Sequence, residues 1–332
     1  MQYRMLGSTG LRVSEIGFGC GNVGGLMVRE SHDEQLDAVR HALDLGINYF
    51  DTARAYGEGK SETHLGRVLE EVGEDVVLST KIRLEADALD DIAAAAAFEV
   101  EQGLARLGRP SVDLIQLHTR LAMKREDGRF AMTPGEVLGP GGVIEAFKRL
   151  RDQGRVGFFG FTGLGEVEAI HALVDSGEFH SFQAYYNLLN PSAGQPVPEG
   201  FSALDYGRVI DRAAARGMGV VVIRVLAAGV LSPTPESGGG TSREPLSAGS
   251  DYERDVARAH KLGFLQDHRL ESLPQAAMRF ALMKPEVSTV LVGFSNNAQI
   301  DEAVACSGAG PLPDAAMAGL REMWDSDFGD RS

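Results

Sequence analysis

Short runs of apolar and β-branched residues alternate with longer amphipathic segments along most of the chain. A run of about four to eight such residues between polar or glycine residues is typical of a strand that is buried on both faces. The pattern therefore predicts eight strands, at Ile16–Cys20, Ile47–Phe50, Val76–Thr80, Val112–Leu117, Val156–Phe161, Ser181–Ala184, Val220–Ile223 and Thr289–Val292.

The segments between these runs carry apolar residues at the three- and four-residue spacing of a helix. In His32–Gly46, for example, Leu36 and Val39 begin such a stripe and the segment ends on glycine, a common helix stop. Another helix is expected to start at Ser61, because serine favours the N-cap position. Strands that alternate with helices predict a parallel sheet, and eight such units in 332 residues fit a (β/α)8 TIM barrel. A doubly wound open sheet is the alternative.

The two ends of the chain lie outside this alternation. Tyr3–Leu6 and Leu11–Val13 flank a glycine-containing turn, which predicts a β-hairpin before the barrel. Near the other end, Ala315–Trp324 has a helical pattern and is followed by a short acidic tail. No linker-like stretch divides the chain, so we expect a single domain over residues 1–332.

Two long segments interrupt the alternation. Arg120–Gly142 and Ser232–Ser250 are rich in glycine and proline, and each follows the C-terminal end of a predicted strand. Barrels carry their active sites on this face, so both segments are candidates for lids or substrate walls. An ordinary surface loop is the alternative for the second segment.

Charge and composition narrow the possible partners. A formal net charge of −15 argues against binding to nucleic acid or to anionic membranes. The two cysteines and the eight histidines show neither a disulfide pattern nor the spacing of metal ligands, so no metal site is expected. No signal peptide and no run long enough to span a membrane is visible. We therefore expect a cytoplasmic protein that acts on small molecules.

Four reactive side chains fall at or near predicted strand ends. Asp51, Lys81 and His118 each follow a predicted strand, and Tyr56 lies in the loop after Asp51. In a barrel these ends open on one face. A phenol, with an ordinary pKa of about 10, is a poor proton donor near neutrality unless a neighbouring ammonium stabilises the phenolate.

Lys81 could provide that ammonium, and Asp51 could hold Lys81 in place. His118 could hydrogen-bond to a substrate oxygen or relay a proton. Such a set would protonate a carbonyl oxygen while hydride reaches the carbonyl carbon, or would act in reverse on an alcohol.

A glycine pattern offers a competing interpretation. Gly19–Gly24 matches G-x-G-x-x-G after a predicted strand, as in dinucleotide-binding Rossmann units. However, Gly25–Met27 shows no clear helix start, and the next strand-end acid, Asp51, lies too far along the chain. We favour a first barrel loop close to the ligand, with Gly21 among the contacts. Motifs of serine hydrolases, zinc proteases and P-loop nucleotidases are absent from the sequence.

Several motifs together resemble the aldo-keto reductase family. They are LGSTGLRVSEIGFG, INYFDTARAYG, SETHLGRVL, LSTK, VDLIQLH, QAYYNLLN and VLVGFSNNAQIDEAV. The resemblance spans nearly the whole chain and implies a TIM barrel that binds NAD(P)(H) without a Rossmann domain. It also implies a catalytic tetrad in which Tyr56 is the general acid and base, supported by Asp51, Lys81 and His118. The segments GFTGL and STVLVGFSNNAQIDEAV are most similar to NAD-dependent galactose and fucose (aldose) dehydrogenases, which favours a sugar or polyol substrate.

The resemblance further implies a set of cofactor contacts. Gln183 matches the glutamine that binds the nicotinamide carboxamide, and Thr162 stands where the family usually has serine. The asparagine that usually follows is Gly163 here, and the aromatic residue that stacks on nicotinamide is Ile223. The other expected contacts are Gly21, Arg224, Leu226, Ser295, Gln299 and Glu302.

Two of these positions bear on the type of cofactor. Arg224 could pair with the cofactor pyrophosphate or form a buried structural ion pair. Many relatives carry Arg or Lys after the eighth strand for the 2′-phosphate of NADP, but residues 293–304 contain neither. Glu302 in that stretch suits a ribose better than a phosphate. We therefore favour NAD(H), with use of both cofactors as the alternative.

The altered nicotinamide surroundings at Gly163 and Ile223 leave a second class of function open. The chain could be a cofactor-binding regulatory or sensor protein, like the channel β-subunits that share this fold. The complete set of four catalytic residues favours the enzyme, because a binding module has no need of them.

Overall fold

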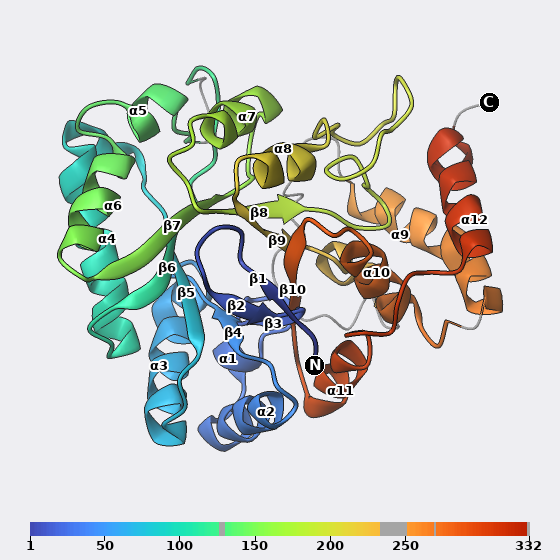
Figure 1. Ribbon diagram of the computed structural model, residues 1–332, viewed down its shortest axis with the longest axis horizontal. Helices are drawn as coiled ribbons and strands as arrows, with labels where there is room; N and C mark the ends of the chain where they lie inside the picture. The colour runs from blue at the N-terminus through green and yellow to red at the C-terminus, as the bar shows by residue number, and fades with distance from the viewer. Residues whose placement is uncertain (126–129, 233–250, 269, 331–332) are drawn as a thin grey trace.

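The computed structural model describes residues 1–125, 130–232, 251–268 and 270–330, and a closed barrel of parallel strands lies at its centre (Figure 1). Around the ring the strands follow the order β10-β3-β4-β5-β6-β7-β8-β9. Their bounds are β3 (Ile16–Gly19), β4 (Tyr49–Asp51), β5 (Val77–Ile82), β6 (Val112–Leu117), β7 (Val156–Thr162), β8 (Ser181–Tyr185), β9 (Gly219–Ile223) and β10 (Val287–Gly293). The predicted TIM barrel and its eight strands are confirmed, and the open-sheet alternative is wrong.

Helices surround the barrel (Figure 1). In chain order they are α1 (Leu26–Arg29), α2 (His32–Asp44), α3 (Lys60–Val72), α4 (Ile92–Leu107), α5 (Pro134–Leu138), α6 (Val143–Asp152), α7 (Val167–Asp175), α8 (Val209–Ala215), α9 (Tyr252–His260), α10 (Leu273–Leu282), α11 (Asn297–Val304) and α12 (Asp314–Asp325). Short 3-10 turns are η1 (Gly57–Gly59), η2 (Ala86–Asp90), η3 (Ala227–Gly229), η4 (Lys261–His268) and η5 (Asp327–Gly329). No helix of the described ranges is long and apolar enough to cross a membrane.

Five strands (β4, β5, β7, β8 and β10) end later than predicted, and the extension of β4 and β5 matters for the site. Asp51 lies inside β4, where it pairs with Ser79, and Lys81 lies inside β5, where it pairs with Gln116. Pairing with a neighbouring strand fixes the backbone of a residue far better than a loop does. The acid and the amine therefore stand on the rigid wall of the barrel.

The predicted helix start at Ser61 is wrong, and a helix that was not expected follows the first glycine loop. α3 begins at Lys60 with Gly59 as its N-cap, and Ser61 lies inside the helix. The Ser61 hydroxyl instead donates to the carbonyl of Cys20 (2.9 Å) and lies 2.8 Å from Oγ1 of Thr52, so it ties α3 to the ends of β3 and β4. A one-turn helix, α1, does follow the first glycine loop, capped by Gly25 in the left-handed region.

The predicted hairpin, β1 (Tyr3–Met5) and β2 (Arg12–Ser14), is confirmed as an antiparallel pair. Its turn covers the end of the barrel at which β9 begins. Gly7, with φ of 54°, lies so close to the backbone of β9 that a Cβ would come within 2.2 Å of the nitrogen of Gly219. The turn therefore requires glycine at this position.

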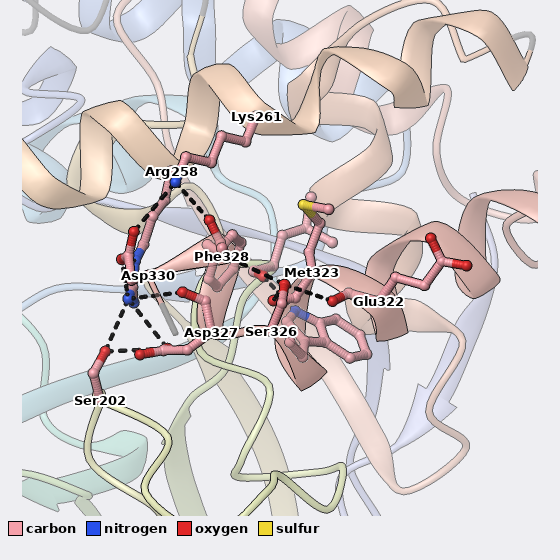
Figure 2. Close-up of polar contacts among 12 residues, drawn as sticks. Ser202, Arg258, Lys261, Glu322, Met323, Ser326, Asp327, Phe328 and Asp330 are labelled. Carbon is pink, nitrogen blue, oxygen red and sulfur yellow. Dashed lines mark hydrogen bonds and ion pairs between the residues drawn. The ribbon is translucent and has the colours of Figure 1, made fainter. Parts of the chain in front are cut away.

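The C-terminal helix is confirmed as α12, and its end is anchored to the rest of the fold (Figure 2). Trp324 is buried and donates from Nε1 to the carbonyl of Leu188 (2.9 Å). Arg258 of α9 lies among Ser202, Asp327 and Asp330. Trp324 thus packs in the core.

Candidate active site

Asp51, Tyr56 and Lys81 contact one another at the ends of β4 and β5. The Lys81 ammonium donates to a carboxylate oxygen of Asp51, to the carbonyl of Thr52 (2.8 Å) and to Oη of Tyr56 (3.2 Å). The same Nζ lies 4.7 Å from the centroid of the Tyr56 ring. The ammonium is therefore held by two acceptors at the C-terminal end of β4 and donates to the phenol as well.

The Asp51 carboxylate is buried and has further donors. Its Oδ2 accepts from Ser79 Oγ (2.9 Å), Gln183 Nε2 (2.9 Å) and, at longer range, Gln116 Nε2 (3.4 Å). Burial raises the pKa of Asp51, against the opposing effect of Lys81 and these donors. Burial alone would lower the pKa of Lys81, but the charges of Asp51 and Tyr56 and the hydrogen bonds to both together outweigh it, and the pKa is raised. Lys81 therefore keeps its proton at neutral pH.

His118 follows β6 and faces the phenol. Its ring stands edge-on to Tyr56, with 6.1 Å between centroids and 80° between planes. Nδ1 is buried and has no hydrogen-bond partner among the described residues. Burial, together with the positive charges of Lys81, Arg83 and Arg224, lowers the pKa of His118 to about 3. The imidazole is therefore neutral over the physiological range.

A cavity of about 330 Å³ opens beside these residues. Asp51, Tyr56 and His118 line it, whereas Lys81 is buried behind Tyr56. Of the other predicted contacts, the lining includes Gly21, Thr162, Gln183, Arg224 and Leu226. It does not include Ser295, Gln299 or Glu302.

The first glycine loop forms one wall of the cavity. A Cβ on Gly21 would lie 3.6 Å from the Tyr56 ring, an ordinary contact, whereas one on Gly24 would lie 2.3 Å from the backbone of Gly293 and Phe294. The glycines thus serve close packing of this loop between the phenol and β10. β3 is followed in the ring by β4, so the loop belongs to a barrel and not to a Rossmann unit.

The floor of the cavity carries an amide. Gln183 Oε1 accepts from Thr162 Oγ1 (3.0 Å), and Gln183 Nε2 donates to Asp51. The position where the resemblance leads us to expect asparagine is Gly163, and the neighbouring groups leave little room for a side chain there. A Cβ at this position would lie 2.8 Å from Cε2 of Phe182 and 3.1 Å from the carbonyl of Gln183.

Arg224 lies directly after β9, next to Ile223, in an unusual conformation. Its φ is 56°, and those of Ala227 and Ala228 are also positive, a region that L-residues rarely adopt. Its carbonyl accepts from Asn187 Nδ2 (3.0 Å). Burial lowers the pKa of Arg224, although Tyr185 and Tyr56 oppose the effect. The guanidinium forms no ion pair with any residue in the described ranges, so no structural ion pair accounts for it there.

The remaining predicted contacts lie beyond β10. Ser295 Oγ donates to the carbonyl of Gly24 (2.8 Å), and Ser295 N donates to Gln299 Oε1 (2.8 Å). The Glu302 carboxylate accepts from Ser272 on the outer layer. The structure thus gathers Ser295 and Gln299 beside the first loop and leaves Glu302 apart from the cavity.

A cation that was not predicted, Arg29, lies beside Ser295. Nη2 of Arg29 donates to the same carbonyl, that of Gly24 (3.0 Å), and Nη1 donates to that of Asn22 (2.6 Å). Residues 293–304 lack a cation, but α1 supplies one next to them. No local signal could reveal this, because the two segments lie at opposite ends of the chain.

The long segment after β6 reaches the cavity through Arg120 and Phe130. It contains α5, while residues 126–129 lie outside the described ranges. Of the second predicted lid, Ser232–Ser250, residues 233–250 also lie outside those ranges. Among the residues that the structure does describe, no group of three or more His, Cys, Asp or Glu could hold a metal ion.

Comparisons with known proteins show the family of this chain. The model of the aldo/keto reductase family matches residues 15–325. The chain belongs to the aldo/keto reductase family. It is 28% identical over 311 residues to the L-galactose dehydrogenase of Arabidopsis thaliana, covering 92% of this chain and 88% of that protein.

Two further relatives show the range of this family. A putative voltage-gated potassium channel subunit beta of Schizosaccharomyces pombe is 27% identical, and the match covers 91% of this chain and 87% of that protein. Among solved structures, the holo form of the aldo-keto reductase AKR11C1 from Bacillus halodurans superposes with a TM-score of 0.70 at 25% identity, covering 98% and 96% of the two chains. The family thus includes both oxidoreductases and a channel-subunit relative.

Proposed function

We propose that this aldo/keto reductase interconverts a carbonyl compound and an alcohol with NAD(P)(H), using Tyr56 as general acid and base. One observation carries the proposal: the Lys81 ammonium donates to the phenol oxygen of Tyr56 while held by buried Asp51. A protein that only binds a cofactor gains nothing from an ammonium directed at a phenol. A proton donor does, because the ammonium stabilises the phenolate that is left behind.

The cavity suits a nicotinamide cofactor. Beyond its bonds to Asp51 and Thr162, the Gln183 amide keeps one N–H and one oxygen lone pair. That donor and acceptor match a carboxamide, and we assign Gln183 to it. Gly21 and Leu226 would contact the rest of the cofactor along the cavity wall. When bound, the cofactor supplies hydride to a carbonyl carbon or accepts it from an alcohol carbon.

The protein's own residues handle the proton. In reduction, Tyr56 Oη donates its proton to the carbonyl oxygen, and Lys81 stabilises the resulting phenolate. His118, being neutral, donates a hydrogen bond to the same oxygen without adding charge. In oxidation, the phenolate of Tyr56 removes the proton of the alcohol.

For the choice of cofactor we propose a preference for NAD(H). No Lys or Arg occurs in residues 293–304, and Ser295 and Gln299 offer hydroxyl and amide groups suited to a ribose. Arg29 is the group that would admit a 2′-phosphate, but two of its guanidinium nitrogens already donate to loop carbonyls. Fluorescence titration with NADH and NADPH tests the preference. A much tighter complex with NADPH contradicts it.

For the substrate we propose an aldose, a simple aldehyde or a ketone. The similarity to L-galactose dehydrogenase, and to a pyridoxal 4-dehydrogenase of Microbacterium luteolum at 27% identity, supports this class. Turnover with a panel of aldoses and aldehydes, in the presence of either cofactor, tests the enzyme against the alternative suggested by the channel-subunit relative. Cofactor binding without turnover of any panel member would support a regulatory or sensor protein.

A further inference from the structure

The charged groups of the cavity do not balance. Asp51 is neutralised by Lys81, and Glu85 forms an ion pair with Arg83 at 2.9 Å. One further arginine of the lining, Arg224, has no ion-pair partner in the described part of the chain. The lining therefore carries an excess of positive charge in a protein whose formal net charge is −15. A cationic cavity in an acidic protein indicates a ligand with negative charge.

Arg224 has unused hydrogen-bonding capacity. Its guanidinium has no ion-pair partner in the described part of the chain, and the residue lines the cavity together with Tyr56 and His118. A guanidinium has donors in a fork that matches a carboxylate or a phosphate. The position is also built at a cost, because Arg224 adopts a φ of 56°. Such strain persists where the surrounding structure enforces it, here through Asn187 on the carbonyl.

We propose that Arg224 binds a carboxylate or phosphate group of the substrate, so that the preferred substrates are anionic aldehydes, ketones or alcohols. The proposal rests on the proposed function and sharpens its substrate class. Arg224 is a specificity residue in this account, because it would hold a remote part of the substrate while Tyr56 acts on the reacting oxygen.

The cofactor pyrophosphate could supply the same chemistry, and two observations favour the substrate. The charge of Arg224 contributes to lowering the pKa of His118, so the guanidinium acts on the reacting end of the cavity. The groups expected near adenosine, Ser295 and Gln299, do not line this cavity. An anionic group on the substrate would stay within this cavity, whereas the cofactor pyrophosphate is separated from the reacting carbon by the nicotinamide ribose.

Matched substrate pairs test the proposal. We suggest 4-carboxybenzaldehyde against methyl 4-formylbenzoate, and succinic semialdehyde against its methyl ester. In wild-type protein the carboxylate of each pair should have the higher kcat/KM. Arg224→Gln should lower kcat/KM for the carboxylates about 10- to 100-fold and change that for the esters by less than about threefold. Arg224→Lys should recover part of the loss.

Arg83→Gln is the matched control. It also removes a cavity cation, but one that already has Glu85 as its partner. It should therefore change the preference for carboxylates far less than Arg224→Gln does. Equal effects of the two substitutions would show that general charge, and not a specific site at Arg224, sets the preference.

A binding measurement separates failure of this proposal from failure of the proposed function. Isothermal titration compares 4-methylbenzoate with 4-methylbenzamide, neither of which can react. Benzoate binding that is lost in Arg224→Gln supports the anion site even if no aldehyde is turned over. Turnover of esters and carboxylates at equal rates, or a weaker NADH complex in Arg224→Gln with an unchanged carboxylate preference, would overturn it. The latter result would assign Arg224 to the pyrophosphate.

Discussion

Arg258 and Arg224 have opposite surroundings. Arg258 on α9 donates to Asp330 (2.7 Å) and Ser202 (2.9 Å), lies 3.1 Å from a carboxylate oxygen of Asp327, and stacks over Phe328 (Figure 2). Arg224 at the barrel mouth has no ion pair with a described residue. The first guanidinium has its donors satisfied within the fold and fixes the C-terminal segment. The second keeps its donors for a ligand.

The two cations of the site, Lys81 and Arg224, differ in the same way. Lys81 resembles Arg258, because it is buried and its acceptors are all protein groups. It differs in that one of those acceptors, Tyr56, faces a cavity. A buried cation therefore serves stability, binding or catalysis according to what it faces, and the predictions below separate these roles.

The largest combined effect is expected for Lys81→Met. It leaves the Asp51 carboxylate buried without its cation, which should cost about 3–5 kcal/mol of unfolding free energy. It also removes the ammonium that stabilises the phenolate, so turnover should fall at least about 100-fold. Urea unfolding and steady-state kinetics measure the two effects.

Lys148→Met is the control for this substitution. Lys148 pairs with Glu178 on the surface, where both side chains are exposed, so its loss should cost about 1 kcal/mol or less. If Lys81→Met loses stability but retains wild-type turnover, Lys81 is a structural cation like Arg258.

A smaller effect, on stability alone, is expected for Arg258→Leu. Asp327 is buried and would lose its cation, whereas Asp330 is partly exposed and can be solvated. We expect a loss of about 3 kcal/mol in urea unfolding, with kcat/KM of the folded protein unchanged. Arg212→Leu, which breaks the exposed pair with Asp175, should cost about 1 kcal/mol or less. Loss of turnover in folded Arg258→Leu would contradict the prediction that Arg258 serves stability alone.

The smallest effect, measured per pH unit, is a pH dependence of stability that arises at His118. Its pKa falls from 6.5 to about 3 in the folded protein, so between these values the unfolded chain binds one more proton at this residue. Its contribution to the unfolding free energy is complete above pH 6.5 and is lost on acidification, at about 1.4 kcal/mol per pH unit. His118→Gln should remove this part of the slope. Identical slopes between pH 4.5 and 6.5 in both proteins would contradict a neutral, buried His118.

Much of the fold follows from local patterns. Eight apolar runs predicted eight strands because a barrel strand is buried on both faces and leaves an uninterrupted apolar signal. Boundaries were less accurate where pairing decides them, as at Asp51 and Lys81, which are polar yet lie inside strands. Ser61 has the residue type of an N-cap, but its hydroxyl is engaged by Cys20 and Thr52, a contact between distant segments.

The site residues also divide into those that the sequence could predict and those that required the structure. Asp51, Tyr56 and Lys81 could be placed together from the barrel hypothesis, since parallel strands open on one face. Arg29 beside Ser295 could not, because only the closed ring brings α1 against the end of β10. The surroundings of Arg224 also required the structure, since two alternatives for it were equally compatible with the sequence.

The central claim is that Tyr56 gives the proton to the substrate oxygen. Tyr56→Phe keeps the ring against Gly21 and His118 and removes only the hydroxyl. Single-turnover oxidation of bound NADH, followed by stopped-flow fluorescence with the best aldehyde of the panel, should slow by about 10²–10⁴-fold. The NADH dissociation constant and the urea midpoint should stay close to those of the wild type. An unchanged single-turnover rate in Tyr56→Phe would contradict the mechanism.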